Sequence, residues 1–208
     1  MNTAEHGAAP GGGPGAGSDQ VDAGSMSTIP EGGDKARELI ADLVAHGCPV
    51  VLCTPHRHHG KCRDDCDREL NQPAGWASVD PDPGTAARYR PGWHTPALVT
   101  GHVLDAIDVD TKHGADLAEV IERAIAAGVL IVGYHATPSG GAHLFVASTG
   151  IATAAKPANG VDFRGGCADG SGRGLIYLPG SNRPKYPDRD YQVVQHIDWD
   201  RLAEVVNG

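Results

Sequence analysis

The sequence predicts an α+β domain, because segments with strand character outnumber segments with helical spacing and the two kinds are interspersed along the chain. The chain has 208 residues, of which 40% are hydrophobic, and this is enough for one sizeable core. No apolar run approaches the roughly 20 residues that cross a membrane, and the N-terminus has no basic segment followed by an apolar one. We therefore expect a cytoplasmic protein without a membrane partner.

Residues 1–33 are rich in Gly, Ala, Pro and Ser and nearly free of large apolar side chains. Such a segment buries too little surface to offset its ordering entropy, so we expect a disordered N-terminal tail. Residues 34–208 are then expected to form one folded domain.

The helices are predicted from apolar residues that recur at a spacing of three to four. The first begins near Asp34 and ends at Gly47, and a second begins at Leu117 and is ended by Gly128. Two further helices are predicted, a short one at 85–89 and a closing one at 197–206.

The strands are predicted from short apolar runs bounded by turn residues. The runs at 97–100 and 103–110 are expected to pair around a turn at Gly101 and His102. The remaining predicted strands lie at 49–53, 130–135, 142–147, 160–164, 174–178 and 191–195.

A pair of acidic residues interrupts the apolar strand that ends at Asp110. Side chains alternate across a strand, so Asp108 and Asp110 share one face while Ile107 and Val109 pack on the other. Two carboxylates this close repel unless a cation lies between them, and hard divalent ions such as Mg²⁺ or Mn²⁺ prefer oxygen ligands. Taken alone, the pair is better explained by a strand that enters a polar turn. Asp105 has the opposite parity, and we expect it to be solvated.

A glycine-rich turn lies between two predicted strands, at Ser139, Gly140 and Gly141. Two glycines permit close backbone approach, so their amides can point at an anion. His143 follows at the start of an apolar strand, where it can contact a phosphate oxygen or orient a metal-bound group. A hairpin turn with an incidental histidine is the alternative.

A third acid, Asp162, stands between apolar residues, and Arg164 lies on the same face of that strand. The pattern fits a third metal ligand and a phosphate partner. An Asp–Arg pair on a strand face is also commonplace, so this segment alone does not decide between the two.

Residues 53–66 hold a dense group of cysteines and histidines. Tetrahedral zinc takes four such ligands, and the set we favour is Cys53, His56, Cys62 and Cys66. His58 or His59 can replace His56 in that set. The expected role is structural, a closed site that holds a loop without a core, with a flexible loop lacking metal as the alternative.

The formal net charge of −9 counts against a simple nucleic-acid binder, which is usually basic. Basic residues nevertheless cluster late in the chain, at Lys156, Arg164, Arg173, Arg183, Lys185 and Arg189. Charge alone therefore neither supports nor excludes a nucleic-acid partner. No G-x-x-x-x-G-K-[ST] segment is present, so a P-loop ATPase or helicase is not encoded here.

The order and spacing of these segments resemble the archaeo-eukaryotic primase superfamily, specifically the bifunctional primase/polymerase (prim-pol) domain of plasmids, phages and integrated elements. The matching segments read ALVTG, IDVD, TPSGGAHLF, GVDFRG and LIYLPGS, within roughly residues 34–178. The resemblance implies a mixed or antiparallel sheet with an RNA-recognition-motif-like (RRM-like) core, flanked by helices.

The resemblance also implies the roles of the site residues. Asp108, Asp110 and Asp162 would bind two Mg²⁺ or Mn²⁺ ions, and His143 with the turn at 139–141 would contact the incoming nucleotide. The activity implied is DNA primase and DNA polymerase chemistry, a two-metal nucleotidyl transfer on a single-stranded DNA template. Unwinding would come from a separate replicative helicase.

Two other functions stay open at this point. One is a catalytically inactive, zinc-containing replication module that binds single-stranded nucleic acid. The other is a metal-dependent phosphodiesterase or nuclease, because two metals held by carboxylates also serve hydrolysis.

Overall fold

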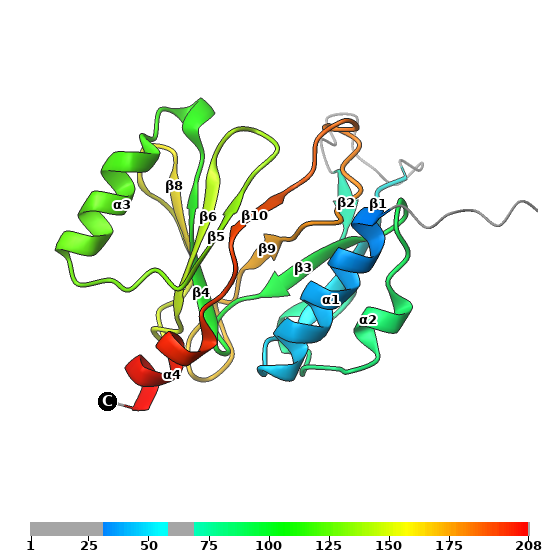
Figure 1. The fold of residues 1–208 in the computed structure, drawn as a ribbon, viewed down its shortest axis with the longest axis horizontal. Helices are drawn as coiled ribbons and strands as arrows, with labels where there is room; N and C mark the ends of the chain where they lie inside the picture. Colours follow the sequence, from blue (N-terminus) through cyan, green and yellow to red (C-terminus); the bar gives the residue numbers. More distant parts are fainter. Residues whose placement is uncertain (1–30, 58–68, 208) are drawn as a thin grey trace, which may run out of the picture.

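The computed structural model describes residues 31–57 and 69–207, which form two antiparallel sheets with helices packed around them (Figure 1). The helices are α1 (Glu31–Ala45), α2 (Thr85–Arg88), α3 (Leu117–Ala126) and α4 (Trp199–Asn207), with short 3₁₀ turns η1 (Trp76–Ser78) and η2 (Thr111–His113). The strands are β1 (Val50–Pro55), β2 (Leu70–Asn71), β3 (Thr95–Val99), β4 (Leu104–Val109), β5 (Gly133–Ala136), β6 (Ala142–Ala147), β7 (Ala154–Ala158), β8 (Val161–Arg164), β9 (Leu175–Tyr177) and β10 (Gln192–Gln195).

The smaller sheet has the strand order β2-β1-β3-β9, and the larger one has the order β10-β5-β6-β4-β8-β7. Every strand pairing in the described part of the chain is antiparallel. The predicted α+β class with antiparallel sheets is thus confirmed, whereas the RRM-like core stays a prediction.

The expected pairing of the strands on either side of Gly101 is wrong. β3 pairs with β1 and β9 in the smaller sheet, while β4 pairs with β6 and β8 in the larger one. The chain passes between the sheets at Gly101, whose φ of 83° is unfavourable for other residues and whose α-carbon lies against the backbone of Gly166. This crossing links an inner strand of one sheet to an inner strand of the other instead of folding a hairpin.

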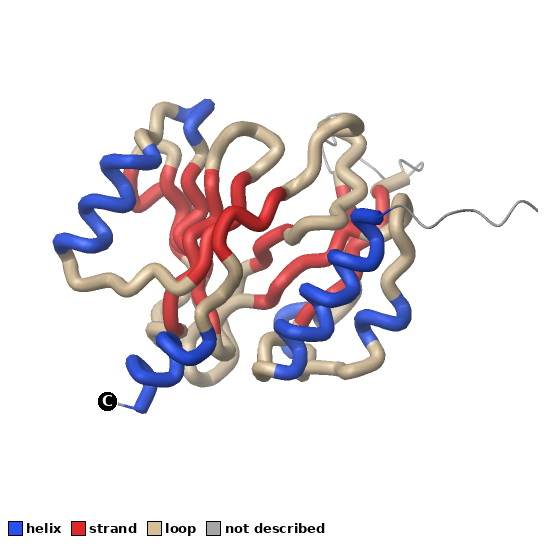
Figure 2. The backbone as a smooth tube through the Cα atoms, viewed as in Figure 1, coloured by secondary structure: helices blue, strands red, loops and turns tan. Residues whose placement is uncertain are grey.

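One hydrophobic core joins both sheets to the helices α1 and α4. Leu98 of β3, Leu104 of β4 and Phe145 of β6 are buried in it with Ile40 of α1 and Leu202 of α4. Figure 2 shows the two groups of strands side by side, with these helices at their edges. The two sheets thus share one cluster of buried apolar side chains.

Helices α1 and α4 are also fastened directly to each other. The rings of His46 and Trp199 stack at 4.0 Å between centroids, and the Trp199 indole N–H donates to Asp42 at 2.9 Å. The closing helix therefore completes the core instead of trailing from it.

Helix α3 covers the outer face of the larger sheet, as its apolar spacing predicts. Ile107 and Val109 of β4 contact Leu117, Val120 and Ile121 of this helix. Asp116 caps the helix by accepting the N–H groups of residues 118 and 119. The opposite face of β4 is thereby left for Asp108.

Helix α1 begins at Glu31, so its first three residues lie before the predicted boundary at 34. The rest of the predicted tail, residues 1–30, lies outside the described residues. Two strands, β2 and β7, were not predicted. Within the described ranges, no helix has the length and apolar character that a membrane crossing requires.

Candidate active site

Four polar side chains form a row across the middle of the larger sheet. In the strand register, Asp108 of β4 lies opposite Asp162 of β8 on one side and His143 of β6 on the other. His143 in turn lies opposite His135 of β5. Directly opposed residues of antiparallel strands share a face with Cβ atoms about 5 Å apart, so the row converges on one surface.

The three predicted metal ligands lie together, Asp108 and Asp162 through this register and Asp110 just past the end of β4. Asp108, Asp110 and Asp162 all line one pocket of about 380 Å³, and their side chains are 26%, 28% and 25% exposed. The pKa of Asp108 is raised, first by burial and then by the nearby carboxylates of the other two, although Arg164 opposes the shift.

Each of the three carboxylates contacts a basic side chain of the same chain. Arg164 Nη2 lies 2.7 Å from Asp162 Oδ2 and 3.4 Å from Asp108 Oδ2. Asp110 Oδ2 lies 3.3 Å from Lys112 Nζ and 2.9 Å from His113 Nδ1. In this arrangement, the described residues contain no group of three Cys, His, Asp or Glu side chains that could hold a metal ion. The carboxylate oxygens are donors that suit Mg²⁺ or Mn²⁺. In this structure, those oxygens are paired with basic side chains of the chain itself.

The predicted glycine turn is present, but its amides are used internally. The N–H of Gly140 donates to the carbonyl of Thr137, and the N–H of Gly141 donates to the Thr137 hydroxyl, both at 3.0 Å. The Ser139 hydroxyl lies 3.0 Å from that same hydroxyl and faces the cleft described below. The hydroxyl groups of this turn, more than those two amides, are therefore placed to meet a ligand.

The glycines instead position Asp110. A Cβ at residue 141 would collide with the carbonyl of Val109, and one at residue 160 would meet the carbonyl of Asp110 at 2.6 Å. The N–H of Asp110 donates to the carbonyl of Gly160 at 2.6 Å. Two strands thus approach the end of β4 more closely than any side chain would allow.

His143 is a buried, neutral imidazole. Burial, with smaller effects from His135, Arg164 and Arg183, lowers its pKa to about 3. Its Nε2 lies 3.6 Å from Asp108 Oδ1, and its ring stacks on Tyr191 at 5.3 Å. A neutral ring held in this way can donate one hydrogen bond toward the carboxylate or a phosphate without repelling a metal ion.

A larger cleft of about 440 Å³ opens between the two sheets beside the acids. Asp108, Asp110 and His143 lie on its wall from the larger sheet, while Trp76 and Tyr177 come from the smaller sheet and its loops. Its size is within the range of small-molecule sites. Five basic side chains line it, namely Lys112, Arg164, Arg173, Arg183 and Lys185. We call the last three of these the basic wall.

The basic wall is the part of the site that sequence reasoning missed. The loop between β9 and β10, orange in Figure 1, arches over to the end of β2 and carries Arg183 and Lys185. Arg183 donates to Glu69 at 2.6 Å and to the Tyr191 hydroxyl at 2.6 Å, and it lies 4.7 Å over the ring of Tyr177. The late cluster of basic residues was the available signal for this wall.

The predicted zinc set is only partly within the described residues. Cys53 is fully buried in an apolar cluster, and burial raises the pKa of its thiol to about 11. His56 Nδ1 lies 2.9 Å from the Asn71 side-chain oxygen. Cys62 and Cys66, with the alternatives His58 and His59, lie outside the described residues. The zinc site stays a prediction.

The buried side chain of His135, at the end of the polar row, is expected to make the fold less stable in acid. It is fully buried, neither ring nitrogen has a hydrogen-bond partner among the described residues, and burial lowers its pKa to about 4. Because the unfolded chain takes up a proton near pH 6.5 and the folded one does not, stability falls as the pH drops from about 6.5 toward 4. Between neutral pH and about pH 5, we expect the free energy of unfolding of His135→Phe to fall by about 2 kcal/mol less than that of the wild-type protein.

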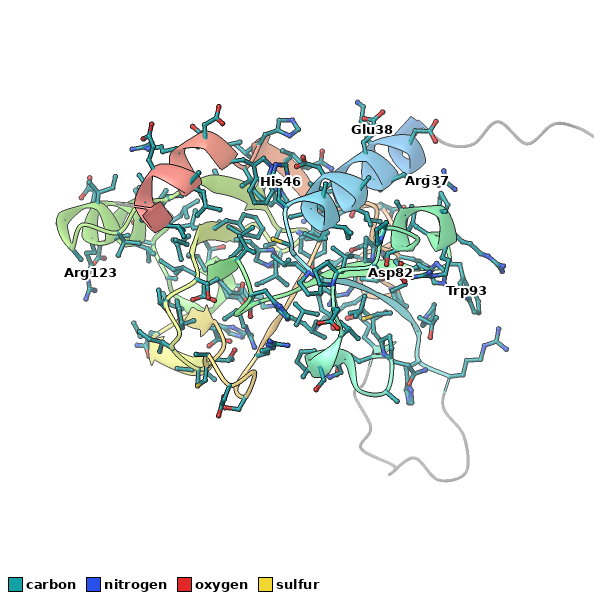
Figure 3. The ribbon with its side chains drawn as sticks, turned by 90° about the horizontal axis from the view of Figure 1, so that it is seen from below. Arg37, Glu38, His46, Asp82, Trp93 and Arg123 are labelled. Atoms are coloured by element: carbon teal, nitrogen blue, oxygen red, sulfur yellow. The ribbon has the colours of Figure 1, made fainter. Side chains whose placement is uncertain are left out.

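Urea unfolding at neutral pH and at about pH 5 measures this effect. The same substitution at His46, which lies on the surface (Figure 3), serves as the control. Parallel pH profiles for wild type and His135→Phe would contradict the assignment of the acid sensitivity to this ring.

A family model described as "Bifunctional DNA primase/polymerase, N-terminal" matches residues 40–205 of the chain. A search of curated proteins with the sequence of the chain found no match. The matched range contains all of the polar row, the glycine turn and the basic wall.

Proposed function

Because the chain belongs to the bifunctional DNA primase/polymerase family, we propose that it is a nucleotidyltransferase that makes or extends primers on a DNA template. The observation that carries this proposal is the convergence of Asp108, Asp110 and Asp162 on one pocket beside a cleft with a basic wall. An acidic pocket next to cationic side chains suits a reaction between a hydroxyl group and a nucleoside triphosphate.

We propose that the three carboxylates hold two Mg²⁺ or Mn²⁺ ions. When bound, such ions would help to activate a primer 3′-hydroxyl and neutralise the triphosphate and the departing pyrophosphate. His143 keeps a neutral donor at the edge of this pocket, where it contacts the incoming nucleotide. The strand register of Asp108, Asp162 and His143, and the backbone hydrogen bond of Asp110 to Gly160, support a site that needs little reorganisation during the reaction.

The remaining predicted contacts follow from the walls of the cleft. Ser139, at the tip of the turn whose geometry Gly140 and Gly141 permit, and Arg164 are proposed to meet the triphosphate. The basic wall is proposed to bind the phosphates of single-stranded DNA, and Trp76 offers a ring on which a base can stack. A cationic wall inside an acidic protein confines nucleic-acid binding to the cleft.

A zinc ion and a partner protein complete the proposal. A structural zinc ion is proposed for the segment at 53–66. Elemental analysis of the purified protein tests this proposal, and we expect about one zinc per chain. A separate replicative helicase is proposed to supply unwinding, which co-purification with candidate helicases would test.

Incubation with labelled nucleotides, Mg²⁺ or Mn²⁺ and unprimed single-stranded DNA tests the function, and sizing of the products separates the alternatives. We expect new strands that depend on the template and the divalent ion. Shortened template would instead indicate a nuclease, and unchanged template with bound protein would indicate an inactive binding module. Parallel reactions with ribo- and deoxynucleotides define which substrate is used.

A further inference from the structure

The arginine that contacts two of the three aspartates is itself incompletely satisfied. The Nε of Arg164 is buried without a hydrogen-bond partner among the described residues, although its Nη2 contacts Asp108 and Asp162. Guanidinium groups that stay in one place usually have their donors paired. The unpaired Nε indicates that this position is not the one in which Arg164 is best satisfied.

Arg164 and Lys112 also stand where the two cavities meet. Arg164 lines both the acidic pocket and the larger cleft, and Lys112 lines the cleft while its Nζ contacts Asp110. Their side chains are 29% and 44% exposed, so part of each side chain is open to solvent. Each can turn from a carboxylate toward the cleft by side-chain rotation alone, because long basic side chains have several rotatable bonds.

We propose that Arg164 and Lys112 exchange partners when substrate binds, which makes Lys112 a second triphosphate-binding residue. In the free protein they neutralise the three aspartates. When a nucleotide arrives with its divalent ions, both side chains leave the carboxylates and pair with phosphate oxygens. The exchange rests on the proposed function, and it assigns to these side chains a role in coupling the binding of metal and nucleotide.

The charge balance of the site favours such an exchange. Two divalent ions and a nucleoside triphosphate carry nearly equal and opposite charges, so the net charge of the pocket is almost the same before and after binding. A metal ion that binds alone would leave Arg164 and Lys112 without an anion, in a pocket where unpaired charge is costly. Metal and nucleotide should therefore bind cooperatively, and each should strengthen the other by the same factor.

Two affinities measured on the full-length chain test the exchange. Mn²⁺ binding without nucleotide is followed by electron paramagnetic resonance, and binding of a fluorescent, non-hydrolysable deoxynucleoside triphosphate is followed at saturating Mn²⁺. We expect Arg164→Ala and Lys112→Ala to bind Mn²⁺ alone several-fold to about tenfold more tightly, because carboxylates are released, and to bind the nucleotide about tenfold more weakly.

Two matched variants serve as controls. Lys185→Ala removes a basic side chain that lines the cleft but makes no ion pair with the three aspartates in the described structure. The affinity of this variant for Mn²⁺ alone should therefore differ from that of wild type by less than about twofold. Arg123→Ala changes the outer surface on α3 (Figure 3) and should leave both affinities unchanged.

Opposite changes in the two affinities are the signature of the exchange. Weaker binding of both ligands would overturn it, since that is the result of a merely structural role, and so would unchanged affinities in a wild-type background that binds both. A wild-type protein that binds neither Mn²⁺ nor nucleotide would overturn the proposed function as well. If Arg164→Ala does not fold, the more exposed Lys112→Ala decides the outcome alone.

Discussion

Replacement of Asp108 with Asn is expected to reduce nucleotide incorporation by about 10³-fold or more without unfolding the protein. The amide keeps the size of the carboxylate but removes the negative charge at the centre of the polar row. Asp108 contacts both His143, at 3.6 Å, and Arg164, at 3.4 Å, so its loss affects the metal pocket and the nucleotide contact together. A primer-extension assay with Mn²⁺ measures the loss, and the double variant Asp108→Ala, Asp110→Ala should abolish synthesis.

The thermal unfolding midpoint separates a chemical effect from a structural one. Arg164 retains its shorter contact, the 2.7 Å pair with Asp162, so the midpoint of Asp108→Asn should remain within a few degrees of wild type. Glu119→Gln, on the exposed side of α3, is the matched control for removal of one acidic charge. Undiminished synthesis by folded Asp108→Asn would remove this residue from the active site.

The chemistry of the site was predictable where it depends on local periodicity. Alternation along β4 places Asp108 and Asp110 on one face, and the same rule applies to Asp162 and Arg164 on β8. His143 follows from its place at the start of β6. These predictions needed only the direction of a side chain relative to its own strand, which a short stretch of sequence determines.

What the sequence did not predict depends on which segments meet in space. The basic wall forms because the loop after β9 reaches Glu69 at the end of β2, more than a hundred residues earlier. β7 was missed because its sequence AAKPA has no β-branched residue, and it forms only as an edge strand beside β8. Neither feature has a local signature.

Asp105 is the residue for which sequence reasoning was wrong. Its parity places it away from Asp108, and we expected it to be solvated, yet it is fully buried. It accepts the N–H and the hydroxyl of Thr149 at 2.7 and 2.8 Å and the N–H of Gly101 at 3.1 Å. The carboxylate thus fastens the turn between the two sheets to the end of β6, because the backbone donors there have to be satisfied.

Replacement of Asp105 with Ala is therefore expected to destabilise the fold by about 3 kcal/mol, since both donors of Thr149 lose their acceptor and the N–H of Gly101 keeps only the carbonyl of Leu104. Asp105→Asn retains one oxygen and should cost less, about 1 kcal/mol. Burial raises the pKa of Asp105 although these hydrogen bonds oppose the shift, so its folded form binds a proton more readily than the unfolded chain. The contribution of this group to stability hence rises as the pH falls through the folded pKa.

Urea unfolding of Asp105→Ala and Asp108→Asn, with primer extension on both, gives a test from one strand. The two residues lie three positions apart on β4. Asp105→Ala should lose stability but keep its rate of synthesis per folded molecule. Asp108→Asn should keep its stability but lose synthesis. If Asp105→Ala unfolds at the wild-type urea concentration, the carboxylate does not hold the crossing between the sheets. If it loses synthesis while its stability is unchanged, Asp105 belongs to the site and the face assigned to β4 is wrong.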